Sequence, residues 1–131
     1  MVAYNFQGRF AADVEAGRKN QTLRPVGLRA HARPGDVLQL YTGMRTKACR
    51  NLGDAICTHA IPVMIHANQD AEPKVSMALE TGLLDMNARD RFARSDGFGS
   101  FQDFEDWWLR THGVGTFSCV LIKLRGLEPS S

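Results

Sequence analysis

The feature that most constrains the fold is an apolar run over residues 55 to 65, which carries a proline near its end. The run is far shorter than the roughly 20 residues that a membrane helix needs, and it is typical of one long β-strand. Proline has no backbone N–H to donate to a neighbouring strand. Pro62 therefore predicts that this strand has an edge or a bulge at that point.

Three further segments have the periodicity or the capping residues of helices. Phe6, Phe10 and Val14 recur at i, i+4 and i+8, which predicts a helix over residues 5 to 16. A second helix is expected over residues 84 to 93, with Asp85 or Asn87 as its cap. Ser100 predicts the start of a third, which ends near Gly113. Its inward-facing residues are expected to be Phe101, Phe104, Trp107 and Trp108.

Turn residues and short apolar runs predict the remaining strands and loops. The expected strands are residues 20–24, 37–41, 75–79 and 116–124, and the expected loops are residues 26–34 and 68–74. With 131 residues the chain predicts a single domain, residues 1 to 131, whose last residues, 125 to 131, form a mobile tail. The mixture of elements predicts an α+β fold.

Cysteine and histidine usage limits the possible chemistry. Cys49, Cys57 and Cys119 have no paired spacing, which predicts free thiols in a reducing cytoplasm. The N-terminal residues lack the pattern of a signal peptide, and no apolar run predicts a membrane helix. The four histidines have no metal-ligand spacing, so we expect neither a metal nor a cofactor.

Positive charge is concentrated in one quarter of the chain. Residues 17 to 50 hold eight lysines and arginines and a single acid, a local charge of +7 in a chain whose net charge is +2. Thr, Gln, Tyr and Gly residues lie between these cations, and such residues contact phosphates and bases. The stretch predicts an anionic partner, with nucleic acid favoured over a solvated basic surface.

Within this stretch, the segment "GRKNQTLR" brings a lysine, a hydroxyl and an arginine together. In an extended chain Asn20, Thr22 and Arg24 point to one side, and the bend at Gly17 lets Lys19 join them. A hydroxyl beside a lysine is either a phosphate cradle or a nucleophile next to its base. Taken alone, such a segment is more often a phosphate cradle.

Three ordered motifs resemble the ASCH domain family of the PUA-like superfamily. They are G-x-K-x-x-T-x-R at residues 17 to 24, P-G-D-x-L-x-L-Y-T-G at 34 to 43, and D-G-F at 96 to 98 before an aromatic helix. The resemblance extends from Phe6 to Leu124. It implies a small mixed β-barrel of five to six strands with about three short helices packed outside, and a cleft lined by the first motif. We expect Tyr41 in the same cleft and Asp96 at its rim.

The resemblance implies two alternative activities and one binding role. The first is a ribonuclease acting on single-stranded RNA, for which the matching catalytic residues are Tyr41, Lys47 and Ser118. The second is an amidohydrolase of a modified nucleoside such as N4-acetylcytidine, with Lys19, Thr22 and Asp96. Asp96 stands where the family has a glutamate. The third is a non-catalytic RNA-binding module.

The pattern Tyr41 with Lys47 favours the ribonuclease, so single-stranded RNA is the expected partner and a nucleoside ligand is the alternative. Cleavage would use the 2′-hydroxyl of the RNA as nucleophile, with cations stabilising the charge that develops on the phosphate. The residues expected to bind RNA are Lys19, Thr22, Arg24, Arg45 and Arg50.

Overall fold

The computed structural model describes residues 2–27, 30–80 and 82–126 of the chain. In these residues seven strands form one sheet. β1 (Val2–Phe6) runs parallel to β3 (Val37–Thr42), and β3 pairs antiparallel with β4 (Arg50–Ala67). The far end of β4 pairs with β5 (Val75–Leu79), which pairs with β6 (Gly82–Leu83). β7 (Gly115–Gly126) lies along β4 and carries β2 (Gln21–Pro25) on its other side.

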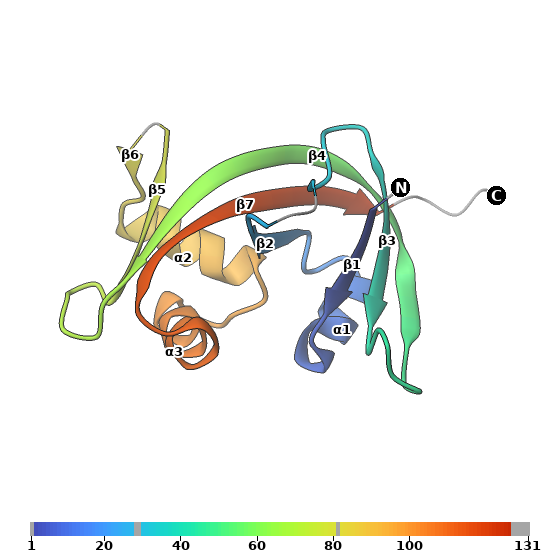
Figure 1. Ribbon diagram of the computed structural model, residues 1–131, viewed down its shortest axis with the longest axis horizontal. Coiled ribbons are helices and arrows are strands. Elements are labelled where there is room, and N and C mark those ends of the chain that lie inside the picture. Colours follow the sequence, from blue (N-terminus) through green and yellow to red (C-terminus); the bar gives the residue numbers. More distant parts are fainter. Residues whose placement is uncertain (1, 28–29, 81, 127–131) are drawn as a thin grey trace.

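The strands β4 and β7 form a long curved pair that arches over the molecule (Figure 1). β1, β3 and α1 (Gly8–Glu15) lie at one end of the arch, and β5 and β6 lie at the other. The sheet does not close into a barrel, so the expected barrel of five to six strands is wrong. The α+β class and the three helices are confirmed in the described residues.

Pro62 lies where β4 has a partner on one side only. The β3 ladder ends at Ile56 and the β5 ladder begins at Met64, so only β7 pairs with β4 at residue 62. The missing N–H therefore does not interrupt a second ladder. The expected edge position is confirmed, and a register shift between Cys57 and His59 adds a bulge nearby.

Two capped helices lie beneath one half of the arch (Figure 1). α2 (Met86–Ser95) begins at Asp85, whose Oδ1 accepts a hydrogen bond from the Ala88 backbone N–H at 2.8 Å. α3 (Phe101–His112) begins at Ser100, whose hydroxyl accepts from the Asp103 N–H at 3.2 Å, and it ends at Gly113. None of the helices in the described ranges is long and apolar enough to cross a membrane.

Aromatic side chains join these helices to the rest of the core. Phe104 is fully buried, and its ring centroid lies 5.3 Å from that of Phe92 and 5.4 Å from that of Phe98. Trp108 is buried as expected from the sequence, whereas Trp107 is only partly buried. Phe98, in the loop between α2 and α3, also contacts the rings of Phe10 and Trp107.

Two further expectations need correction. The helix predicted over residues 5 to 16 is a strand, β1, followed by the shorter helix α1. Phe6, Phe10 and Val14 are all buried, but Phe6 is buried from the strand. The mobile tail predicted over residues 125 to 131 is also wrong at its start, because β7 extends to Gly126; residues 127 to 131 lie outside the described part.

Candidate functional site

A buried ion pair joins the start of β2 to the end of α2. The Lys19 amine lies 3.1 Å from Oδ1 of Asp96 and donates a hydrogen bond to the Asp96 backbone carbonyl at 2.6 Å. The two side chains are only 3% and 6% exposed. Two charges are thus removed from water, which is costly unless both are paired and hydrogen-bonded.

Burial shifts the two pKa values of this pair in opposite directions. It lowers the pKa of Lys19, although the nearby Asp96 opposes the shift. It raises the pKa of Asp96, against the opposing effects of Lys19 and of the hydrogen bond from Gln21. Burial therefore brings the free energy of the neutral form, in which the proton lies on Asp96 and the Lys19 amine is uncharged, closer to that of the ion pair. A neutral amine can accept a proton, which an ordinary exposed lysine at pH 7 cannot do.

Thr22 and Arg24 project from one face of β2, as alternate residues of a strand do. The Nε–H of Arg24 donates to the Thr22 hydroxyl oxygen at 2.8 Å, and its Nη2 donates to the Asn5 backbone carbonyl at 2.7 Å. The guanidinium also lies 5.0 Å from the ring centroids of both Tyr4 and Phe6. Because the Thr22 oxygen accepts from a cation, its own proton is free to be donated elsewhere.

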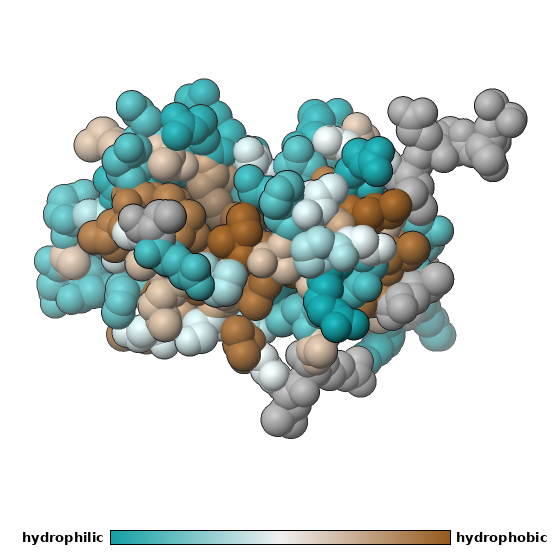
Figure 2. Space-filling model, turned by 90° about the horizontal axis from the view of Figure 1, so that it is seen from above, coloured by the Kyte–Doolittle hydropathy of each residue, from teal (hydrophilic) through white to brown (hydrophobic). Residues whose placement is uncertain are grey.

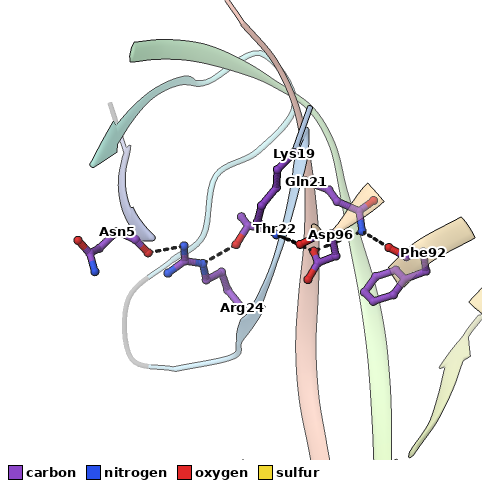
Figure 3. Close-up of polar contacts among 7 residues, drawn as sticks. All are labelled: Asn5, Lys19, Gln21, Thr22, Arg24, Phe92 and Asp96. Atoms are coloured by element: carbon purple, nitrogen blue, oxygen red, sulfur yellow. Dashed lines mark hydrogen bonds and ion pairs between the residues drawn. The ribbon is translucent and has the colours of Figure 1, made fainter. Parts of the chain in front are cut away.

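These four side chains line one cavity of about 180 Å³. In Figure 3, Asp96 lies between Lys19 and Thr22 on one side and Gln21 and Phe92 on the other. Much of the remaining lining is aromatic and comes from β1, α1 and α3: Phe6, Phe10, Trp107, Trp108 and His112. The Lys19 amine lies 4.7 Å from the centroid of the Phe10 ring, so the polar and aromatic parts of the lining are in contact.

Further contacts hold the aromatic part of the lining in place. The Trp107 Nε1–H donates to the Gln7 side-chain oxygen at 3.3 Å, and the ring of Trp108 lies 4.2 Å from that of His112. Burial lowers the pKa of His112, which keeps this ring uncharged at neutral pH. Among the described residues, no atom accepts a hydrogen bond from the buried Trp108 Nε1.

A glycine beside Asp96 makes the close packing possible. Gly97 has a φ of 98°, a backbone conformation that residues other than glycine rarely adopt. A Cβ atom at this position would lie 3.1 Å from the Phe10 ring and 3.5 Å from Cδ of Lys19. The D-G-F motif therefore lets the chain turn directly behind the ion pair.

The structure brings together Lys19, Thr22 and Asp96, the catalytic residues of the amidohydrolase alternative. Arg24, which belongs to the same motif as Lys19 and Thr22, lines the cavity with them. Asp96 is buried in the cavity wall and does not lie at a rim. Tyr41 is not among the residues that line this cavity.

Tyr41, Lys47 and Ser118 are not brought together in the same way. Tyr41 pairs with Asn51 near one end of β4, and Ser118 pairs with Met64 near the other. Thirteen residues separate these two positions of β4, a path of roughly 40 Å along the strand. Lys47 is exposed in the turn after β3, and the Ser118 hydroxyl contacts the Met64 sulfur at 3.8 Å.

The remaining predicted RNA contacts lie at the tip between β3 and β4. Arg45 is exposed there with a φ of 68°, and Arg50 forms an exposed ion pair with Glu15 at 2.6 Å. The tip is tied to the cavity wall, because the Met44 N–H donates to the Asn5 side chain at 2.9 Å. Asn5 thus links the tip to Arg24.

Sequence reasoning missed two contributors to the site. Gln21 contacts Asp96, with 3.4 Å between Nε2 and Oδ1, although strand alternation places it opposite Thr22. His112 was considered only as a possible metal ligand. Trp108 and His112 are four residues apart in one helix, and this spacing predicts that the two rings share a face.

In the described ranges, no three His, Cys, Asp or Glu side chains are grouped so that they could hold a metal ion. Cys57 and Cys119 are buried packing residues, and Cys49 is exposed. Comparisons with protein-family models, with curated proteins and with solved structures found no match to this chain.

Proposed function

We propose that this protein is an amidohydrolase that removes an acyl group from the exocyclic nitrogen of a modified pyrimidine nucleoside such as N4-acetylcytidine. The observation that carries the proposal is the convergence of Lys19, Thr22 and Asp96 in one cavity. Asp96 comes from a distant part of the chain, 77 positions from Lys19.

The proposed reaction starts from the neutral form of the pair, in which the proton lies on Asp96 and the Lys19 amine is uncharged. The Thr22 oxygen attacks the amide carbonyl carbon while its proton passes to the Lys19 amine. The C–N bond then breaks, and Lys19 returns the proton to the leaving exocyclic nitrogen. Water hydrolyses the resulting threonyl ester, which releases the carboxylic acid and restores Thr22. Asp96 holds the proton that would otherwise keep Lys19 charged.

Arg24 has the charge and the position to assist this chemistry. Its hydrogen bond to the Thr22 oxygen favours negative charge on that atom as the proton leaves. The aromatic side chains of the lining suit a flat pyrimidine ring, because ring faces stack favourably on aromatic side chains. A cavity of about 180 Å³ is smaller than most ligand pockets, which take roughly 300–1,000 Å³, so we expect it to hold the acylated base with the sugar outside.

We retain the ASCH-type, PUA-like assignment as part of this proposal. It is supported by the G-x-K-x-x-T-x-R motif, whose lysine, threonine and arginine all line the cavity. The three free thiols are in keeping with a cytoplasmic site of action. The basic residues of the tip, with Arg45 and Lys47 exposed, support RNA as the molecule that carries the modified base.

The test is incubation of the purified protein with N4-acetylcytidine, free and within single-stranded RNA, followed by mass spectrometry for loss of the acetyl group. Thr22→Val is expected to lower the rate at least about 100-fold, as loss of a nucleophile or of a charge-stabilising group does. Thr116→Val, an exposed threonine on β7 that does not line the cavity, is the matched control.

Three outcomes would contradict the proposal. If Thr22→Val and the wild type remove the acetyl group at the same rate, the cavity is not the active site. If neither protein hydrolyses the amide but both cleave RNA, and Lys47→Ala abolishes that cleavage, the ribonuclease alternative replaces it. Binding of RNA without either reaction would leave the Lys19–Asp96 pair as a structural feature of a binding module.

A further inference from the structure

A second cavity, of about 330 Å³, lies between α2 and the sheet. We name it the α2 groove. Its apolar lining comes from β4, β5, β7 and the chain entering α2, and consists of Ile61, Val63, Met77, Leu79, Leu84 and Leu121. Figure 2 shows apolar side chains gathered among hydrophilic ones on the half of the molecule that contains β5 and β6. The volume lies at the lower end of the range of small-molecule pockets.

The lining of the α2 groove is apolar toward β5 and polar toward β2. Val63 and Leu79 are the next residues of β4 and β5 beyond the Met64–Ala78 pair, and Ile61 pairs with Leu121 of β7. Lys123 lies two residues after Leu121 on the same face of β7, and it pairs with Gln21 of β2.

The facing helix repeats the same division. Ala88, Arg91 and Ser95 line the groove at a spacing of three and four residues, so they follow one face of α2. Ala88 lies in the turn nearest the apolar half. Arg91 and Ser95 lie in the following turns and approach the end of the groove that contains Gln21, because Ser95 is next to Asp96 and Asp96 contacts Gln21.

The charges at the polar end have one sign. Arg91 and Lys123 are both exposed, and no carboxylate lines the groove. In the described part of the chain neither side chain forms an ion pair. Two cations beside an apolar channel, with no acid to balance them, are complementary to a ligand with an apolar body and a negatively charged end.

We propose that the α2 groove binds a small amphiphile with an unbranched apolar chain and one anionic head group, such as a medium-chain carboxylate. The chain lies against Leu79, Val63 and Leu84, and the head group lies between Arg91 and Lys123. This site is separate from the cavity of the proposed amidohydrolase, and the inference does not rest on that activity. The two sites share a wall, since Gln21 lines the groove and contacts Asp96 of the cavity.

The experiment is a calorimetric titration of the full chain with decanoate, decyl phosphate, decanol and decyltrimethylammonium, each below its micelle concentration. Decanoate is expected to bind one to one. Decyl phosphate tests whether the head-group site prefers a carboxylate or a phosphate. Decanol, which keeps the chain but lacks the charge, should bind at least about tenfold more weakly, because charge-assisted hydrogen bonds are roughly twice as strong as neutral ones. The cationic amphiphile should not bind in the groove.

Variants test the positions. Arg91→Gln and Lys123→Gln should each weaken decanoate binding by about tenfold and leave decanol binding unchanged. Arg94→Gln, an exposed arginine of the same helix that does not line the groove, is the matched control and should bind as the wild type does. Ala88→Leu should lower the affinity for every amphiphile that binds, because the larger side chain fills the apolar half of the groove. Circular dichroism checks that this variant is folded.

The proposal is overturned if decanoate and decanol bind equally well, if the cationic amphiphile competes with decanoate, or if both Gln variants keep the wild-type affinity. Titration of Thr22→Val keeps the result distinct from the proposed function. If Thr22→Val loses amide hydrolysis but still binds decanoate, neither proposal is contradicted. If the wild type hydrolyses the amide but does not bind decanoate, only the proposal for the α2 groove is refuted.

Discussion

Replacing Asp96 by asparagine tests whether the buried ion pair behaves as described. Asp96→Asn keeps the size of the side chain and the backbone carbonyl that accepts from Lys19, but it removes the negative charge. Breaking a buried pair by removing one partner typically costs about 3–5 kcal/mol of the free energy of unfolding. We expect a loss in this range at pH 7.

The limit on that loss comes from deprotonation of Lys19. Each pKa unit is worth about 1.36 kcal/mol, so keeping a lysine of ordinary pKa, about 10.4, neutral in the folded state at pH 7 costs about 4.6 kcal/mol. At pH 9 the same cost is about 1.9 kcal/mol. If Lys19 is deprotonated in the folded variant, the variant should therefore be much less destabilised at pH 9 than at pH 7.

The sign follows from proton linkage. Between pH 7 and 9 the unfolded variant holds one proton on Lys19 and the folded variant holds none, so its stability rises with pH by up to about 1.36 kcal/mol per unit. In the wild type the pair holds one proton in both states and contributes no such slope. The depressed pKa of Lys19 in the folded state is the origin of the difference.

The assay is urea unfolding followed by tryptophan fluorescence at pH 7, 8 and 9. Asp106→Asn, an exposed aspartate on α3, is the matched control and should stay within about 0.5 kcal/mol of the wild type. The double variant Lys19→Met with Asp96→Leu removes both charges and should recover much of the loss and show no slope. A single variant that loses less than about 1 kcal/mol, with the same gap at every pH, would refute the reasoning.

Two other predictions concern the packing around the site. Gly97→Ala should destabilise the protein by about 1–3 kcal/mol, because its positive φ strains any side chain and the new Cβ would press on Phe10; thermal unfolding measures this, and Gly27→Ala, with open space around it, should change little. Cys49 should react with a thiol reagent in the folded protein, whereas Cys119, whose pKa burial raises to about 11, should react only after unfolding. Equal labelling rates for the two thiols in the folded protein would contradict the described burial.

The parts of the fold that sequence predicted well are those determined by local chemistry. The turn at residues 34 to 36 and the apolar alternation after it predicted β3, and the capping residues Asp85 and Ser100 predicted the starts of α2 and α3. Each of these signals acts within a few residues of the element that it starts or ends.

Strand partners were the part that could not be predicted. β1 is recognisable only through its parallel pairing with β3, more than 30 residues away, and its Phe6 falls by chance on the helical spacing of Phe10 and Val14. The open sheet likewise depends on which partners β4 has along its length, since β3 covers one part of its edge and β5 another. No single-sequence periodicity contains that information.

The same distinction applies to the site. Lys19, Thr22 and Arg24 are close in sequence, so alternation along β2 was enough to group them. Asp96 was added only through the resemblance of its D-G-F motif, because spacing cannot relate residues 77 positions apart. The separation of Tyr41 from Ser118 depends on how two strands are registered on β4, which local patterns do not determine.

Under the proposed function, the position of Asp96 at the end of α2 accounts for an aspartate where the ASCH resemblance implies a glutamate. As the C-cap residue, it presents its carbonyl oxygen and its carboxylate to the same Lys19 amine. The partial negative charge of a helix C-terminus attracts that cation and disfavours a second negative charge beside it. The helix end thus acts in the same direction as burial, which raises the pKa of Asp96. A short side chain keeps the carboxyl group within this field, where it can hold a proton and leave Lys19 free to accept one. An ion pair of this kind adds little stability compared with apolar residues of similar size, and the proposed function gives it a chemical role.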